Sequence, residues 1–251
     1  MLEPSTFAQP PDLTVVADAS SLYQAAAQEF SSSAVEAVKA RGRFSVALSG
    51  GNTPRGVYSL LAAEHKSTLP WDKICVFFGD ERHVPPDDPE SNYRMANEAL
   101  LSKVPIPQQN IFRVPAELPA DEAADRYDRR LRDFFGLATN AWPCFDLILL
   151  GLGDDGHTAS LFPGSAALKE ASRLVVANWV EKFKSYRITF TYPLINHAVE
   201  VAFLVSGKNK AQVVKEILTP APGQAYPAQQ VQPQAGRLLW IMDRDAAQLL
   251  R

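Results

Sequence analysis

The segment Gly151-Leu-Gly-Asp-Asp-Gly-His157 combines residue types that could perform catalysis, and it follows the apolar run Phe145–Leu150. A histidine two residues after an aspartate can act as a general base that the carboxylate orients, so His157 and Asp155 are candidate catalytic residues. The segment also matches the G-x-G-x-x-G pattern of dinucleotide sites. We reject that interpretation because its two carboxylates would repel a pyrophosphate and the expected ribose-binding acid is absent. A loop histidine without a role stays the alternative.

A second segment has the chemistry of a phosphate cradle. It reads Ser49-Gly50-Gly51-Asn52-Thr53-Pro54 and lies between a predicted strand and a predicted helix. Two glycines allow close approach of the backbone to a ligand, and the start of a helix offers free N–H groups to an anion. The Gly-Lys-Ser/Thr ending of a P-loop is missing. A tight strand-to-helix turn without a ligand is the other interpretation.

The charged segment Gly79–His83 follows a third apolar run, Ile74–Phe78. Such segments are often solvated loops. Asp80 comes directly after the strand, however, and we include Asp80 and Arg82 among the candidate catalytic residues. A metal site is conceivable, with ligands from Asp80, His83, Asp155 and His157. No ligand spacing typical of zinc supports it, so we predict no metal.

Two single cations, Arg187 and Lys210, lie near predicted element ends. Each could be an ordinary surface residue. A phosphate bound at Ser49 to Thr53 would need one or two cationic partners, and these two residues are candidates for that role.

Alternating strands and helices must position these segments. The pattern predicts an α/β fold, a doubly wound and mainly parallel sheet with helices on both faces, in which ligands bind at the carboxyl ends of the strands. We predict strands at 13–17, 44–48, 74–78, 145–150, 174–177, 187–191, 201–205 and 238–242. We predict helices over 20–40, from 54, from 91, and over 121–135, 208–218 and 245–250, and a surface loop over 219–233.

Composition limits the possible partners. The net charge is −3, with 25 basic and 28 acidic residues and no basic stripe, so binding to nucleic acid or to an anionic membrane is not indicated. No signal-like segment and no long apolar stretch occur, and the two cysteines do not suggest a disulfide framework. We expect a cytoplasmic protein whose residues 1–251 form a single α/β domain.

Taken together, the motifs resemble those of 6-phosphogluconolactonases, which share a fold with glucosamine-6-phosphate deaminases. The matching segments run from about Leu13 to Leu250 and are Leu48–Pro54, Phe78–Val84, Ser91–Tyr93, Gly151–Pro163, Arg187–Thr191 and Tyr226–Gln229. Asp-Gly-His-Thr-Ala-Ser-Leu-Phe-Pro, ending at Pro163, is the most specific of them.

The resemblance implies hydrolysis of 6-phospho-D-glucono-1,5-lactone, a small phosphosugar lactone, to 6-phosphogluconate in the oxidative pentose phosphate pathway. It implies a general-base role for His157 and an active-site role for Arg82, and it implies no cofactor. Phosphate binding is implied for Ser49, Gly50, Gly51, Thr53, Arg187 and Lys210, and we add Asn52 from the same turn.

Two other functions compete with hydrolysis. A deaminase or isomerase on the same fold would carry a glutamate five positions after the histidine, where this chain has Phe162. A non-catalytic sugar-phosphate sensor would carry a DNA-binding domain ahead of the fold, whereas about a dozen residues precede the first predicted strand. Both features favour the lactonase.

Overall fold

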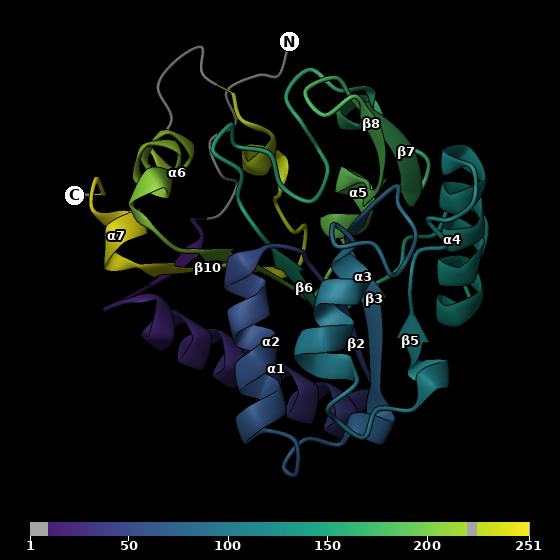
Figure 1. Ribbon diagram of the computed structural model, residues 1–251, viewed down its shortest axis with the longest axis horizontal. Helices are drawn as coiled ribbons and strands as arrows, with labels where there is room; N and C mark the ends of the chain where they lie inside the picture. Colours follow the sequence, from purple (N-terminus) through teal and green to yellow (C-terminus); the bar gives the residue numbers. More distant parts are fainter. Residues whose placement is uncertain (1–9, 220–224, 251) are drawn as a thin grey trace.

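A seven-stranded sheet forms the centre of the protein (Figure 1). The structure is a computed structural model that describes residues 10–219 and 225–250. The strand order is β1-β10-β9-β6-β2-β3-β5, and every neighbouring pair is parallel, as predicted. The strands are β1 (Asp12–Val16), β2 (Phe44–Leu48), β3 (Ile74–Phe78), β5 (Ile111–Phe112), β6 (Leu147–Leu150), β9 (Glu200–Val205) and β10 (Arg237–Asp243).

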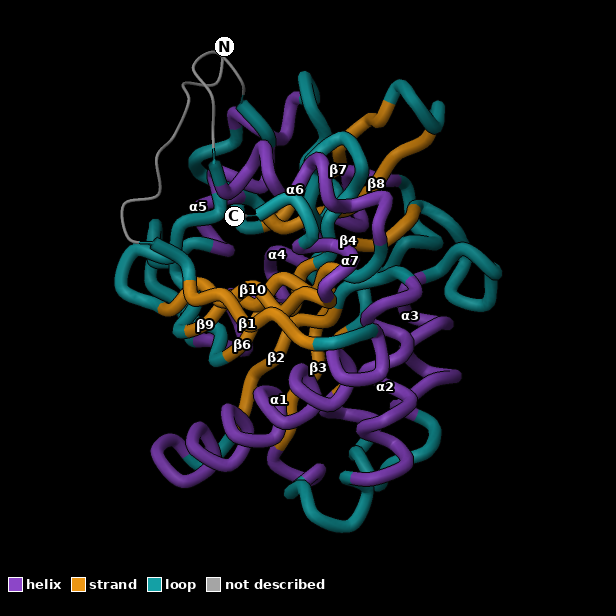
Figure 2. The backbone as a smooth tube through the Cα atoms, turned by 90° about the vertical axis from the view of Figure 1, so that its left-hand side faces the viewer, coloured by secondary structure: helices purple, strands orange, loops and turns teal. Residues whose placement is uncertain are grey.

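Helices lie on both sides of this sheet. Figure 2 shows α1 and α2 on one side and α6 on the other. The helices are α1 (Ala19–Arg41), α2 (Asn52–Glu64), α3 (Asn92–Ala96), α4 (Ala120–Phe135), α5 (Tyr192–Ile195), α6 (Ala211–Leu218) and α7 (Arg244–Ala247). The predicted doubly wound α/β class is therefore confirmed.

The central strands form because their residues are apolar without interruption. All residues of β2, β3 and β6 are buried, which is expected for parallel strands covered on both faces. Helix α1 begins at Ala19, one residue before the predicted bound, because Asp18 rather than a serine accepts the hydrogen bond from the Ser21 N–H, at 2.8 Å.

Two predicted strands do not join the main sheet. β7 (Val175–Val180) and β8 (Ser185–Phe190) form a separate antiparallel sheet with β4 (Asp80–Arg82). Only residues 181–184 connect β7 to β8, and a parallel pair needs a crossover of a dozen or more residues. The expectation that they would be parallel βαβ strands was therefore wrong.

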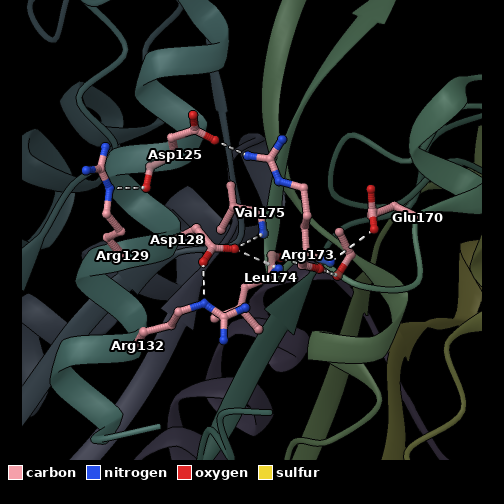
Figure 3. Close-up of polar contacts among 9 residues, drawn as sticks. Asp125, Asp128, Arg129, Arg132, Glu170, Arg173, Leu174 and Val175 are labelled. Carbon is pink, nitrogen blue, oxygen red and sulfur yellow. Dashed lines mark hydrogen bonds and ion pairs between the residues drawn. The ribbon is translucent and has the colours of Figure 1, made fainter. Parts of the chain in front are cut away.

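Helix α4 is less exposed than its charged sequence suggested, because one face packs on the small sheet. Asp128 is buried and links the helix to the start of β7 (Figure 3). One of its carboxylate oxygens accepts hydrogen bonds from the Leu174 N–H (2.8 Å) and the Val175 N–H (3.3 Å), and the other accepts from Arg132 Nε (2.7 Å). A charged residue thus fixes the position of the small sheet.

The predicted surface loop 219–233 lies partly outside the described residues, at 220–224. Its remaining part is not a surface loop, since Ala228 and Val231 are fully buried. Cys75 is buried, whereas Cys144 is exposed, and both are free thiols. Among the described residues, no helix is long and apolar enough to span a membrane.

Candidate active site

A pocket of about 450 Å³ lies at the carboxyl ends of β9, β6, β2 and β3, four neighbours in the sheet. Segments far apart in the sequence meet there because parallel strands all end at the same edge. The pocket is lined by nine of the predicted site residues: Ser49, Gly50, Gly51, Asn52, Thr53, Asp80, Arg82, His157 and Lys210. Asp155 and Arg187 are not among its lining residues.

His157 lies on the loop that follows β6, with its imidazole ring fixed from several sides. Its Nδ1 is hydrogen-bonded to Asp155 Oδ1, and its ring stacks on Phe162 with the centroids 4.0 Å apart. A Cβ atom on Gly153 would lie 2.0 Å from His157 Nδ1, so only glycine fits beside the ring. Because the carboxylate can only accept, Nδ1 carries the proton and Nε2 is the basic nitrogen.

Asp155 lies behind the imidazole and does not line the pocket itself. Burial acts to raise the pKa of Asp155, but the hydrogen bond and charge of His157 outweigh it, so the pKa is lowered. Lys182, from the turn between β7 and β8, lies with its Nζ 3.4 Å from the other carboxylate oxygen. The carboxylate therefore stays ionised and able to orient the imidazole.

The phosphate loop, residues Ser49 to Thr53, connects β2 to α2. Gly51, with a φ of 105°, is the N-cap of the helix and has no side chain to accept from the first-turn N–H groups, which within the described residues are left free for an anion. The Tyr58 hydroxyl accepts a hydrogen bond from the Ser49 N–H at 3.0 Å and donates one to the Ser49 carbonyl at 2.9 Å. The Ser49 Oγ is buried and has no hydrogen-bond partner among the described residues.

Lys210 lines the pocket from the segment after β9, and it is already paired. Its Nζ lies 2.5 Å from Asp154 Oδ1, and Asn209 Nδ2 donates to the same oxygen at 3.1 Å. The hydrogen bond from Lys210 lowers the pKa of Asp154. Our sequence analysis did not identify Asp154 as the partner of Lys210. The two residues are far apart in the sequence, and they meet only because β6 and β9 are neighbours in the sheet.

Arg82 and Arg187 face each other across the antiparallel pair β4–β8. Within the described part of the chain, neither forms a salt bridge. Arg82 donates to the Glu90 carbonyl, and Arg187 donates to Ser185 Oγ at 2.8 Å and lies over the Phe183 ring. Arg187 is only 9% exposed, and burial together with the charge of Arg82 lowers its pKa. Two adjacent unpaired cations are typical of a site for an anion.

Two buried residues that our sequence analysis did not select hold the site together. Glu81 accepts from the N–H groups of Asn92 (2.7 Å) and Tyr93 (2.8 Å), although burial raises its pKa. Asn92 Nδ2 donates to Asp80 Oδ1 at 3.2 Å, while Ser160 Oγ donates to Asp80 Oδ2 at 2.6 Å. Both carboxylate oxygens of Asp80 therefore connect neighbouring segments.

Asn92 also touches the phosphate loop. A Cβ atom on Gly50 would lie 1.9 Å from Asn92 Oδ1, so glycine is required where the two segments meet. The sequence signal was present, because Ser91–Tyr93 was one of the segments that carried the family resemblance. In the described residues, no three His, Cys, Asp or Glu side chains gather in a way that could hold a metal ion.

Comparisons with known proteins agree with this geometry. A family model described as glucosamine-6-phosphate isomerases/6-phosphogluconolactonase matches residues 17–240. A 6-phosphogluconolactonase from Synechocystis sp. is 48% identical over 86% of this chain and 88% of its own length. The rat 6-phosphogluconolactonase is 41% identical over 84% of this chain and 82% of its own length.

Solved structures show the same likeness. The 6-phosphogluconolactonase from Trypanosoma cruzi superposes with a TM-score of 0.87 at 33% identity, covering 96% of this chain and 97% of that one. A monomeric glucosamine-6-phosphate deaminase shares the fold, with a TM-score of 0.77 at 21% identity. This chain is therefore an enzyme that belongs to the glucosamine-6-phosphate isomerase/6-phosphogluconolactonase family.

Proposed function

We propose that this protein hydrolyses 6-phospho-D-glucono-1,5-lactone to 6-phosphogluconate, a step of the oxidative pentose phosphate pathway. The observation that carries the proposal is one pocket lined by two kinds of group. It contains the oriented histidine, His157, together with the free helix N-terminus of the phosphate loop and Lys210. The family membership and the names of the relatives support the same substrate.

Hydrolysis begins with a water molecule. His157 Nε2 removes a proton from water as its oxygen attacks C1 of the lactone, and the new C–O bond gives a tetrahedral intermediate. Asp155 stabilises the imidazolium through the Nδ1 hydrogen bond. A lactone is an activated ester, so this one base is sufficient and no metal is required.

Collapse of the intermediate breaks the bond between C1 and the ring oxygen. The imidazolium returns its proton to that oxygen, and the product acid then ionises. The intermediate carries an oxyanion while it exists. Arg82, which lines the pocket and has no carboxylate partner among the described residues, can stabilise that charge together with backbone N–H groups of the loops.

The phosphate of the substrate supplies orientation rather than chemistry. Free N–H groups of α2, the Ser49 hydroxyl and Lys210 would hold it at the phosphate loop, with Arg187 beside Arg82 adding positive charge. Binding at a distance from C1 restricts the motion of the reacting carbon, which accelerates the attack.

The deaminase alternative lacks a group that it needs. The position five residues after His157 holds Phe162, whose ring stacks on the imidazole. An apolar ring cannot shuttle protons at C1 and C2 of an amino sugar, and it instead shields one face of the base from water.

The decisive test is an assay on freshly prepared 6-phosphogluconolactone with spontaneous hydrolysis subtracted. We expect turnover in the presence of EDTA, and none with glucosamine 6-phosphate. His157→Gln should lower kcat by roughly 10²–10⁴-fold, the usual contribution of a general base, with an unchanged melting temperature. Near-normal turnover by that variant would remove His157 from the mechanism, and release of ammonia from glucosamine 6-phosphate would favour the alternative.

A further inference from the structure

The proline- and glutamine-rich segment contains a rigid turn over Tyr226–Gln230. Tyr192 donates from its hydroxyl to the Pro227 carbonyl at 2.8 Å, and Gln229 Nε2 donates to the Ile217 carbonyl at 3.3 Å. Ala228 and Gln229 are fully buried. Contacts to α5 and α6 therefore fix this turn in place.

The same turn lies against the histidine loop. The Ala228 N–H donates to the Gly156 carbonyl at 3.0 Å. A Cβ atom on Gly156 would lie 2.3 Å from Tyr226 Cδ1, so the tyrosine ring rests directly on the Cα of the residue before His157. Gly156 also has a φ of 71°, which favours glycine for a second reason.

We propose that Tyr226 is a positioning residue for His157. The ring and the Ala228 amide together hold the Gly156 peptide, and His157 projects from the next residue. The imidazole is thereby kept against Asp155 and Phe162 in one orientation. This role rests on the proposed function of His157 as the general base, and a misplacement of about 1 Å at such a residue can cost about 100-fold in rate.

The two ends of the tyrosine have separate tasks. Its hydroxyl donates to Glu216 Oε2 on α6, which lowers the pKa of Glu216, whereas its ring contacts Gly156. The ring supplies the contact with the histidine loop, and the hydroxyl only secures the ring. Tyr226→Phe should therefore keep the positioning that Tyr226→Ala removes.

The chain offers a matched control. Tyr23 on α1 also packs on a glycine, because a Cβ atom on Gly56 would lie 2.4 Å from Tyr23 Cζ. Both tyrosines are partly buried against the core and neither lines the pocket, but Tyr23 contacts α2 rather than the histidine loop. Tyr23→Ala removes the same kind of packing without touching the histidine loop.

The experiment measures kcat and KM of the three variants. We expect Tyr226→Ala to lower kcat by roughly 10- to 100-fold with KM within about threefold, because the phosphate contacts stay intact. Tyr226→Phe and Tyr23→Ala should keep kcat within about threefold of the wild type. If Tyr226→Ala keeps normal kcat, or if Tyr226→Phe loses as much as Tyr226→Ala, the proposal is overturned.

A second measurement separates this inference from the proposed function. The chain has 4 histidines, so the ring signals of His157 can be assigned by NMR from the His157→Gln variant. Without any substrate, Tyr226→Ala should shift and broaden these signals, and Tyr23→Ala should not. Unchanged signals in Tyr226→Ala overturn the inference. Absence of lactonase activity in the wild type overturns only the proposed function.

Discussion

Arginines are used in opposite ways in two regions of this molecule. Arg82 lines the pocket and Arg187, its neighbour on β8, lies beside it without lining the pocket, and no carboxylate among the described residues forms a salt bridge with either. At the α4–β7 cluster, formed by Asp125, Asp128, Arg129, Arg132 and Arg173, two arginines each have an aspartate partner (Figure 3).

The presence or absence of a carboxylate partner indicates whether an arginine serves ligand binding or the stability of the fold. An unpaired buried guanidinium costs stability, because burial removes its hydration without a compensating charge. The same charge is available to an anionic ligand. A paired arginine loses that availability and instead fixes two elements relative to each other. We therefore expect substitutions in the pocket to change activity and those in the cluster to change stability.

Among the substitutions that test this comparison, the largest effect should follow from Arg187→Met, which removes the charge but keeps an aliphatic side chain over Phe183. A charge-assisted hydrogen bond to phosphate contributes about 1.5–3 kcal/mol, so kcat/KM for the phosphorylated lactone should fall by roughly 10- to 100-fold. Unphosphorylated gluconolactone should be hydrolysed as before. The melting temperature should not fall. Equal loss with both substrates would assign Arg187 to the fold or to the chemistry rather than to the phosphate.

Asp128→Asn, in the α4–β7 cluster, should lower stability and leave activity unchanged. The change removes the ion pair with Arg132 and weakens acceptance from the Leu174 and Val175 N–H groups, and a buried group left unsatisfied costs about 1–3 kcal/mol. Denaturant unfolding should show that loss, with kcat/KM of the folded enzyme unchanged. Asp125→Asn is the matched control, because that side chain is 55% exposed and its ion pair should contribute at most about 1 kcal/mol. Equal losses from both variants would contradict this view of the cluster.

Much of the central sheet could be predicted from the sequence. Phe44–Leu48 and Ile74–Phe78 were predicted with their observed bounds, because an uninterrupted apolar run between polar turns fits a buried parallel strand. The strands predicted at 174–177 and 187–191 are present as Val175–Val180 and Ser185–Phe190, but they form a separate antiparallel sheet rather than part of one mainly parallel sheet. Periodicity identifies a strand but does not determine its neighbours, and here the short connection between the two was the neglected signal.

Part of the candidate site could also be predicted, because the positions of the strand ends follow from the predicted parallel sheet. Residues that follow a strand directly, such as Ser49, Asp80 and the loop of His157, all reach the same edge of a parallel sheet. Asp154 and Asn92 lie in segments that the sequence analysis noted, but the sequence does not show their contacts with Lys210 and with the phosphate loop. Their places depend on strand order, which only the folded chain determines.

A third cluster has an excess of carboxylates instead of unpaired cations. In it, Arg237 forms ion pairs with Asp12, Glu29 and Glu200. Burial, and then the charge of Glu29, raise the pKa of Glu200 to about 7. Between its ordinary pKa and about 7, Glu200 is protonated in the folded protein but ionised in the unfolded chain. The folded state therefore binds more protons, so the free energy of unfolding should fall as the pH rises through 7.

Glu200→Gln removes that ionisation. Its melting temperature should exceed that of the wild type at high pH and lose this advantage at low pH, where Glu200 is protonated. Glu36→Gln, on the exposed face of α1, is the control and should show no such dependence. An advantage of Glu200→Gln that is the same at both pH values would show that packing rather than charge is responsible.

The smallest effect should come from Lys182, whose Nζ lies 3.4 Å from Asp155 and whose side chain is 62% exposed. Removing this cation makes the electrostatic potential around Asp155 and His157 more negative, which favours the protonated imidazole of His157. A base must be unprotonated to act, so Lys182→Gln should move the acidic limb of the pH–rate profile to higher pH. An exposed pair contributes at most about 1 kcal/mol, and Lys182 contacts Asp155 rather than His157, so the shift should stay below about 0.7 pH units.

Lys184→Gln is the control for this shift, because Lys184 lies in the same turn and pairs only with Glu181, at 4.0 Å. The profile should be measured at low ionic strength and again at high salt, since screening weakens an exposed pair. We expect the difference between Lys182→Gln and the wild type to shrink in salt. A shift of equal size from Lys184→Gln would mean that the net charge of the turn, rather than the contact with Asp155, acts on His157.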